Sequence, residues 1–222
     1  MKNLRKWNVI CYYLAYVIMH VLFSRVRSHL TGIPSAVAVI MQLTSYAVLG
    51  LWGIWTFRRE LAEGLKLWRE HFLKSVLWLV GGYVLDMVLM TVFSIPLAYG
   101  FPDYEGLNEN NVASLVGKYP GVVLLLVLGI LGPITEETVF RLFPVTRGKG
   151  KVPVALAIFA GALGFMLIHV HALTVPELVY NLPHFATGLA YGFVLYKSRN
   201  ATIPILLHVL NNSVAILAML LQ

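Results

Sequence analysis

The sequence has 222 residues, of which 59% are hydrophobic and only 12% are charged, and its mean hydropathy is +0.76. This charged fraction is about half that of a typical soluble domain, so the composition predicts an integral membrane protein and excludes an ordinary soluble enzyme. The formal net charge of +7 is divided among short loops, so we attribute it to membrane topology and lipid contact and expect no nucleic-acid partner.

Long apolar windows predict an all-α, polytopic membrane bundle of about seven transmembrane helices in one integral membrane domain, residues 1–222. The positive-inside rule favours a cytoplasmic N-terminus, because the basic residues then gather on the cytoplasmic side. The windows are residues 7–23, 34–57, 75–98, 120–143, 152–173, 177–196 and 203–221.

Two segments outside these windows have a residue pattern that predicts their structure. Residues 58–74 place Leu61, Leu65, Trp68 and Phe72 at helical spacing among charged residues, which predicts an amphipathic helix at the membrane interface. The longest polar segment, residues 100–118, contains three acidic residues and is predicted to be a solvated external loop. These are Asp103, Glu105 and Glu109.

Small residues recur at four-residue spacing in the fifth and sixth windows, which predicts that these helices pack closely in the bundle. The pairs are Ala157 with Gly161, Ala160 with Gly164, and Gly188 with Gly192.

Three charged residues lie close together in the fourth window: Glu136, Glu137 and Arg141. Each ionised group at membrane depth costs at least about 2.5 to 3.5 kcal/mol, so this group implies compensating partners or a reaction. Glu137 and Arg141 are four residues apart and are predicted to form an ion pair on one helix face. Glu136 points about 100° away and has no cation in its own helix, so we expect a free carboxylate that can act as a general base.

The fifth and seventh windows repeat this four-residue spacing with Phe165 and His169, and with His208 and Asn212. Each pair alone fits a structural role. Three helices that each present polar groups at helical spacing, in a chain so poor in charge, favour a functional site. Asp86 is expected to be structural or to face a pore, and His184 and Glu177 are weaker candidates for the site.

Peptide hydrolysis is the chemistry that these residue types favour. Glu136 would be the base for an attacking water, His169 would orient the water, and His208 and Asn212 would donate hydrogen bonds to the oxyanion. Alternatively, Glu136, His169 and His208 would be three ligands of Zn²⁺ with an open position for water. The spacing does not separate these mechanisms. Straight helices would place the three residues at different depths, so we expect the fifth helix to end within the membrane, with a buried turn at 171–176.

The motifs Glu136-Glu137-x-x-x-Arg141, Phe165-x-x-x-His169 and His208-x-x-x-Asn212, in this order, resemble the CAAX-protease and bacteriocin-processing (CPBP) family of intramembrane endopeptidases, also called the Abi family. The resemblance covers about residues 120–222 and implies a helical bundle with a site inside the membrane.

The same resemblance implies the roles of the site residues. Glu136 would be the general base, His169 the water-orienting residue, and His208 with Asn212 the oxyanion donors. Glu137, Arg141 and Phe165 would be supporting residues. Eukaryotic members trim prenylated proteins, whereas bacterial members act in peptide maturation, bacteriocin immunity or regulated proteolysis, and the short loops of this chain resemble the bacterial kind.

The resemblance leaves three questions open. We favour a reaction without a cofactor, because neither histidine has a nearby carboxylate in the sequence that could orient a metal-bound ring, and zinc is the alternative. The expected partners are a peptide or protein substrate, lipidated or not, and membrane lipid. A transporter would predict an inverted repeat, which we do not find in the sequence, and a non-catalytic immunity or scaffold protein would also retain the motifs.

Overall fold

A computed structural model describes residues 2–22, 35–147 and 153–221, and these residues contain helices and loops but no strand. Residues 23, 34 and 152, at the ends of three predicted windows, lie outside the described part. The elements in chain order are α1 (Lys2–Tyr16), η1 (Val17–Leu22), α3 (Ser35–Thr56), α4 (Arg58–Glu70), α5 (Phe72–Gly100), α6 (Leu107–Ala113), α7 (Gly121–Leu124), η3 (Leu125–Leu131), α8 (Gly132–Glu137), η4 (Thr138–Leu142), α9 (Phe143–Arg147), α10 (Val154–His169), α11 (Val175–Tyr180), α12 (Leu182–Ser198) and α13 (Thr202–Leu220).

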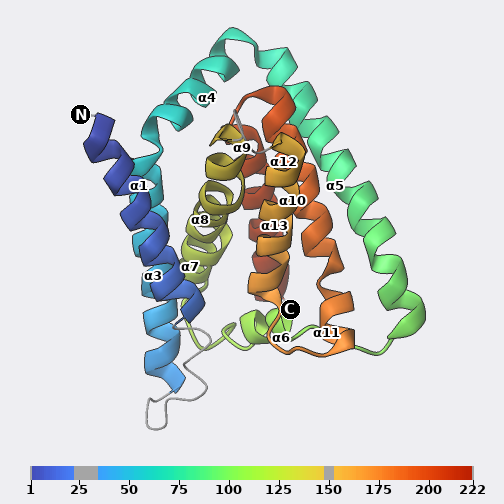
Figure 1. The fold of residues 1–222 in the computed structure, drawn as a ribbon. Helices are drawn as coiled ribbons and strands as arrows, with labels where there is room; N and C mark the ends of the chain where they lie inside the picture. The colour runs from blue at the N-terminus through green and yellow to red at the C-terminus, as the bar shows by residue number, and fades with distance from the viewer. Residues whose placement is uncertain (1, 23–34, 148–152, 222) are drawn as a thin grey trace.

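The helices form a bundle in which α1 and α3 lie on one side and α5 on the other (Figure 1). The continuous helix from α7 to α9 lies between them, together with α10, α12 and α13. The N-terminus and α4 lie at one end of the bundle, and α6, α11 and the C-terminus lie at the opposite end.

The predicted all-α membrane bundle is confirmed, and four described helices are long and apolar enough to cross a bilayer. These are Ala36–Thr56, Phe72–Gly100, Gly121–Thr146 and Thr202–Leu220. Trp7–Met19 and Val154–His169 are shorter apolar helices. The predicted single helix over 177–196 is wrong in its first part, because the chain turns at Asn181 between α11 and α12 and Pro183 lies in the first turn of α12.

The predicted amphipathic helix is present as α4, which ends at Glu70, before a bend at His71. Its Trp68 indole N–H donates a hydrogen bond of 2.9 Å to the hydroxyl of Thr202 at the start of α13. Leu65 is 55% exposed. The helix is therefore anchored to the bundle on one side and leaves apolar surface on the other.

The fourth predicted helix contains two π-helical segments, η3 and η4, on either side of α8. Each such turn has one more residue than an α-helical turn, and insertions of this kind are frequent at functional sites. The short segment α8 carries both Glu136 and Glu137 at its end, so the change in helix geometry occurs directly beside the two acids.

Glycines allow close contacts around α10 and α12, as the small-residue spacing predicts. A Cβ atom added at Gly188 would lie 2.5 Å from the Cα atom of Ala162, and one at Gly161 would lie 2.1 Å from the carbonyl oxygen of Phe140. Both neighbours are backbone atoms, so they cannot move aside as a flexible side chain could.

Gly188→Ala is therefore expected to destabilise the protein by about 1 to 3 kcal/mol, because α10 and α12 would have to separate. The matched control is Gly81→Ala on α5, where an added Cβ meets nothing within 4 Å. Thermal unfolding of the purified protein in detergent compares the two variants. Equal melting temperatures would contradict the close contact.

Candidate active site

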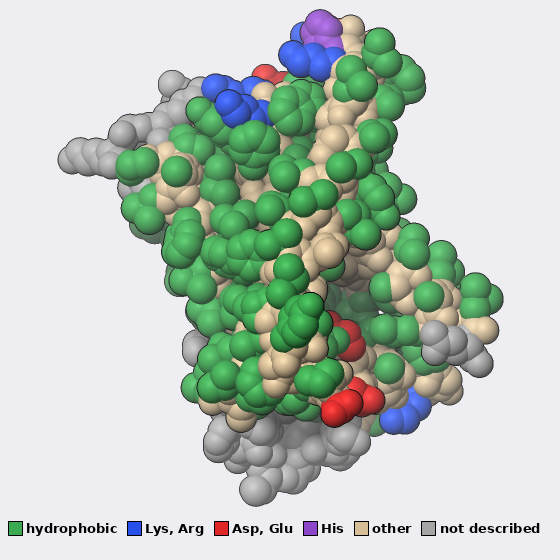
Figure 2. Space-filling view, turned by 90° about the vertical axis from the view of Figure 1, so that its right-hand side faces the viewer, with side chains coloured by type: hydrophobic (Ala, Val, Ile, Leu, Met, Phe, Trp, Pro, Cys, Tyr) green, Lys and Arg blue, Asp and Glu red, His purple; other side chains and the backbone are tan. Residues whose placement is uncertain are grey.

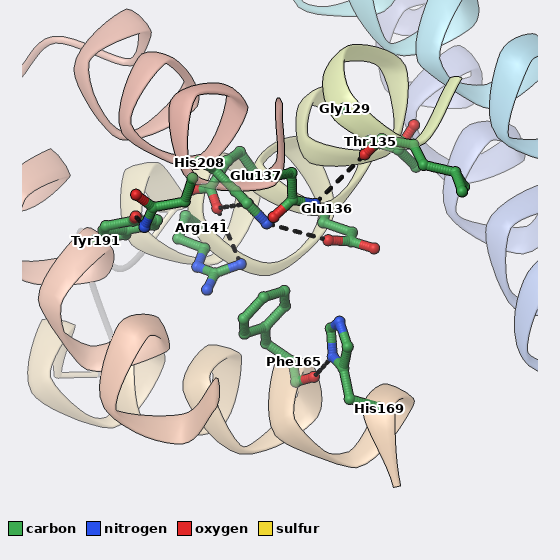
Figure 3. Close-up of polar contacts among 12 residues, drawn as sticks. Gly129, Thr135, Glu136, Glu137, Arg141, Phe165, His169, Tyr191 and His208 are labelled. Atoms are coloured by element: carbon green, nitrogen blue, oxygen red, sulfur yellow. Dashed lines mark hydrogen bonds and ion pairs between the residues drawn. The ribbon is translucent and has the colours of Figure 1, made fainter. Parts of the chain in front are cut away.

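The predicted ion pair between Glu137 and Arg141 is present and has a third member from another helix. Oε1 of Glu137 lies 3.1 Å from Nη1 of Arg141, and both side chains are 1% exposed. The same Oε1 atom lies 2.8 Å from Nδ1 of His208 on α13 (Figure 3). Glu137 therefore connects α8 to α13 as well as to its own helix.

The Arg141 guanidinium lies over an aromatic ring. Its Cζ atom is 3.8 Å from the centroid of Phe165, the first residue of the Phe165-x-x-x-His169 motif. Cation–π contacts of this kind become stronger when the cation is desolvated. Phe165 thus supports the arginine that pairs with Glu137.

Glu136 is buried, and its carboxylate has partners on two other helices. The hydroxyl of Tyr46 on α3 donates to Oε1 at 3.1 Å, and Nε2 of His208 lies 3.5 Å from Oε2. The expectation of a carboxylate without a partner is wrong, because that inference considered only the helix that carries Glu136. Tyr46 is a site residue that the sequence did not indicate.

His208 lies between the two carboxylates, with one ring nitrogen facing each (Figure 3). Each carboxylate can interact with a ring N–H only if both nitrogens carry hydrogen. In that form, Glu136, Glu137, Arg141 and His208 make an electrically neutral cluster, which reduces the cost of burying four ionised groups. The sequence argument that neither histidine has a carboxylate partner is also wrong, since Glu137 is such a partner.

His169 is the last residue of α10, and its Nδ1 atom lies 2.8 Å from the carbonyl oxygen of Phe165. A carbonyl oxygen only accepts, so Nδ1 carries the hydrogen and Nε2 of the neutral ring is an acceptor. The ring stacks on His184 with a centroid distance of 4.1 Å. In Figure 3 the imidazole points in the direction of Glu136. Among the described side chains, no hydrogen bond joins His169 to Glu136.

The helix end expected at the fifth window is present, but the buried turn is not. After His169 the chain leaves the helix, and α11 begins at Val175. His171 is exposed and Leu173 is 84% exposed. The buried polar group here is Glu177, which follows the turn and holds it through the backbone N–H of His171, at 3.0 Å from Oε1.

A cavity of about 210 Å³ lies next to the cluster. It brings together His169, His208 and Asn212, which the sequence predicts as site residues, with His184. Glu136 does not line this cavity. His208 lines the cavity and also contacts the Glu136 carboxylate. The Asn212 amide donates to the Leu128 carbonyl over a long 3.4 Å.

Asp86 anchors a polar wall of the cavity and is 0% exposed. It accepts hydrogen bonds from Thr187 at 2.7 Å, from the Tyr191 hydroxyl at 3.0 Å and from Asn211 at 3.0 Å. These three donors line the cavity, and Asp86 lies behind them. The expected structural role is supported, and the partners come from α12 and α13 rather than from the helix of Asp86.

The zinc alternative requires three ligands that converge. Among the described residues, no three His, Cys, Asp or Glu side chains form a group that could hold a metal ion. Glu136 and His208 are in contact, whereas His169 hydrogen-bonds to neither. The arrangement therefore does not fit the three-ligand site that the sequence left open.

Comparison with known proteins finds relatives that are named as CAAX proteases or membrane peptidases. The family model for type II CAAX prenyl endopeptidase Rce1-like proteins matches residues 118–214, which include all three motifs. The chain is 28% identical over 153 residues to "Membrane-embedded CAAX protease MroQ" of Staphylococcus aureus (strain USA300), covering 65% of this chain and 58% of the relative. It is 25% identical over 153 residues to "Putative membrane peptidase YdiL" of Bacillus subtilis (strain 168), covering 66% and 57%. The matched region thus spans less than two thirds of either relative. No solved structure matches the chain.

Proposed function

We propose that this chain, which is similar over residues 118–214 to the CAAX-protease and bacteriocin-processing family, is an intramembrane endopeptidase that hydrolyses a peptide bond with a water activated by Glu136. The observation that carries the proposal is the placement of Glu136. Its buried carboxylate is held by Tyr46 and His208, and His208 also lines a cavity that contains His169 and Asn212.

The first step is attack by water at the substrate carbonyl carbon. A water between Glu136 and Nε2 of His169 would donate one hydrogen to each acceptor, which directs an oxygen lone pair into the cavity. As the oxygen–carbon bond forms, Glu136 takes the proton. The Tyr46 hydroxyl keeps the carboxylate in one orientation during this transfer.

The second step is collapse of the tetrahedral intermediate. Once Glu136 carries the proton, Nε2–H of His208 no longer faces a charged carboxylate, so the oxyanion would accept hydrogen bonds from this N–H and from the amide of Asn212, whose present bond to Leu128 is long enough to be exchanged. The carbon–nitrogen bond then breaks, and the proton held by Glu136 moves to the leaving amine. This restores the Glu136 carboxylate without a covalent intermediate.

The proposed substrate is a peptide or protein in or at the membrane, with or without a lipid group, and membrane lipid is the other partner. We further propose that the chain crosses the membrane of a bacterial cell several times with its N-terminus in the cytoplasm. The support is that the N-terminus and α4, which carries exposed Arg59, Lys66 and Arg69, lie at the same end of the bundle (Figure 1).

The test is cleavage of a library of apolar peptides by the purified protein in detergent, with products identified by mass spectrometry in ¹⁸O-labelled water. We expect cleavage at internal peptide bonds, with one labelled oxygen in each new carboxyl group. No cleavage of any peptide, in a preparation that is folded, would support the non-catalytic scaffold instead. Zinc is the alternative to a cofactor-free reaction, and hydrolysis by chelator-treated protein distinguishes the two.

A further inference from the structure

The segment expected to be a solvated loop, residues 100–118, reaches the cavity. It contains α6, and Asn108, Glu109 and Val112 of this helix line the cavity together with the stacked imidazoles of His169 and His184. Among the described lining residues Glu109 is the single acid, and none is Lys or Arg. The face that presents α5 shows a hollow with acidic side chains at its edge (Figure 2).

A buried carboxylate fixes the position of α6. Oε2 of Glu177 accepts a hydrogen bond from the Tyr104 hydroxyl at 2.8 Å and a longer one from the backbone N–H of Leu107, the first residue of α6, at 3.5 Å. Oε1 of Glu177 holds the backbone N–H of His171. Glu177 thus ties α6 to the end of α10, and its carboxylate is fully used in doing so.

The side chain of Glu109 packs closely against the backbone of Gly106. A Cβ atom at Gly106 would lie 2.1 Å from Cε1 of Tyr180 and 2.3 Å from Oε2 of Glu109. Both side chains therefore pack directly on the glycine backbone, and no larger residue fits there without displacing them. The Glu109 carboxylate is held against the protein instead of extending into solvent.

The Glu109 carboxylate lacks a compensating charge. Its Oε2 atom is buried and accepts no hydrogen bond of normal geometry, although the Tyr180 hydroxyl and the Asn108 side chain lie close enough to the carboxylate to lower its pKa in part. No ion pair joins Glu109 or Glu177 to a Lys or Arg in the part of the chain that the structure describes. Burial is the main cause that raises the pKa of Glu109, and the nearby carboxylate of Glu177 adds to it. A partly buried carboxylate without a compensating cation is unfavourable, and a bound cation would supply both charge and charge-assisted hydrogen bonds.

We propose that Glu109 binds a positively charged group of the substrate, so that the cavity selects peptides with a Lys or Arg side chain, or a free amino terminus, on the part that lies against α6. This inference rests on the proposed function, since it assumes that the cavity takes a peptide. The remaining cavity wall is largely apolar, with Met90, Leu128 and Ile216, so the peptide would carry its charge within an apolar segment.

Paired peptides test this inference. Otherwise identical apolar peptides with acetylated N-termini carry Lys or Gln at successive positions, and one further peptide has a free N-terminus. Binding to the full-length protein in detergent is measured by fluorescence anisotropy, and cleavage is measured in parallel. We expect about tenfold tighter binding of Lys than of Gln at one position, or of the free amine, as for a charge-assisted hydrogen bond.

The matched variants are Glu109→Gln and Glu105→Gln, which remove the same charge from the same segment, although only Glu109 lines the cavity. The preference should fall to about onefold in Glu109→Gln, persist in Glu105→Gln, and persist in part in Glu109→Asp. Lack of any preference in the unmodified protein, or an equal preference in Glu109→Gln, would overturn the inference. A preference in binding without hydrolysis would support Glu109 as the cation site and contradict the proposed reaction. Hydrolysis without a preference for the cationic peptides would support the proposed reaction and contradict Glu109 as the cation site.

Discussion

Glu136→Gln should abolish peptide hydrolysis while the protein stays folded. Glutamine has one oxygen that can accept from His208 and an amide N–H that can donate to the Tyr46 hydroxyl oxygen, so both contacts that hold the side chain can be kept. It cannot take a proton from water, and loss of a general base lowers the rate by about 10²- to 10⁴-fold. The measurement is kcat for a peptide that the unmodified protein cleaves, with thermal unfolding as the check on folding.

The matched control for this variant is Glu63→Gln on α4, which removes a charge from an exposed position. Its kcat should equal that of the unmodified protein. Substantial hydrolysis by folded Glu136→Gln would exclude Glu136 as the base and would direct attention to His169.

Arg141→Met should be the most destabilising substitution near the site. Arg141 is fully buried, and its removal leaves the Glu137 carboxylate with the His208 ring as its remaining side-chain partner. Removal of one partner of a buried ion pair typically costs about 3 to 5 kcal/mol. The stacked contact with Phe165 is lost as well. Thermal unfolding in detergent, with exposed Arg59→Met as the control, measures the effect.

A second variant separates the contribution of the Arg141 charge to stability from the contribution of its packing. Adding Glu137→Gln to Arg141→Met removes the unpaired carboxylate, so the double variant should be more stable than Arg141→Met alone. If the double variant is equally or less stable, the ion pair is not the main contribution of Arg141, and loss of packing against Phe165 explains the effect.

Contacts within one helix could be predicted from the sequence, because helical spacing determines them. The Glu137–Arg141 pair follows from a separation of four residues, and Phe165 and His169 share a helix face with a ring distance of 4.7 Å for the same reason. Four of the apolar windows likewise identify the described helices that are long and apolar enough to cross a bilayer, since length and hydropathy are local properties.

Contacts between helices could not be predicted in this way. Tyr46 and Glu136 are 90 residues apart, and Asp86 and Asn211 are 125 apart. One chain without a repeat or an alignment gives no register between such helices. His208 looked like an oxyanion donor from its spacing to Asn212, but its bridging position between two carboxylates depends on how α8 and α13 pack.

The prediction of a solvated segment at 100–118 agrees with the exposure of Asp103 and Glu105, but it missed the place of Glu109 for a different reason. The composition of the segment favours solvent, and acidic residues in a loop are usually solvated. Here a buried carboxylate from α11, Glu177, holds the segment in place and brings Glu109 into the cavity wall. Thr174 before Pro176, with Glu177 three residues after the threonine, was a local signal for the start of α11, whose N-terminus Thr174 caps.

In the proposed reaction Glu136 activates water without a metal ion. The most direct measurement is peptide hydrolysis by protein treated with a strong chelator, with the zinc content of the same preparation determined by mass spectrometry. We expect that activity follows the amount of protein, persists when zinc is far below one ion per chain, and is absent in Glu136→Gln. Activity that falls with the zinc content and returns when zinc is added would contradict this reaction, and would make Glu136, His169 and His208 ligands after a rearrangement of the site.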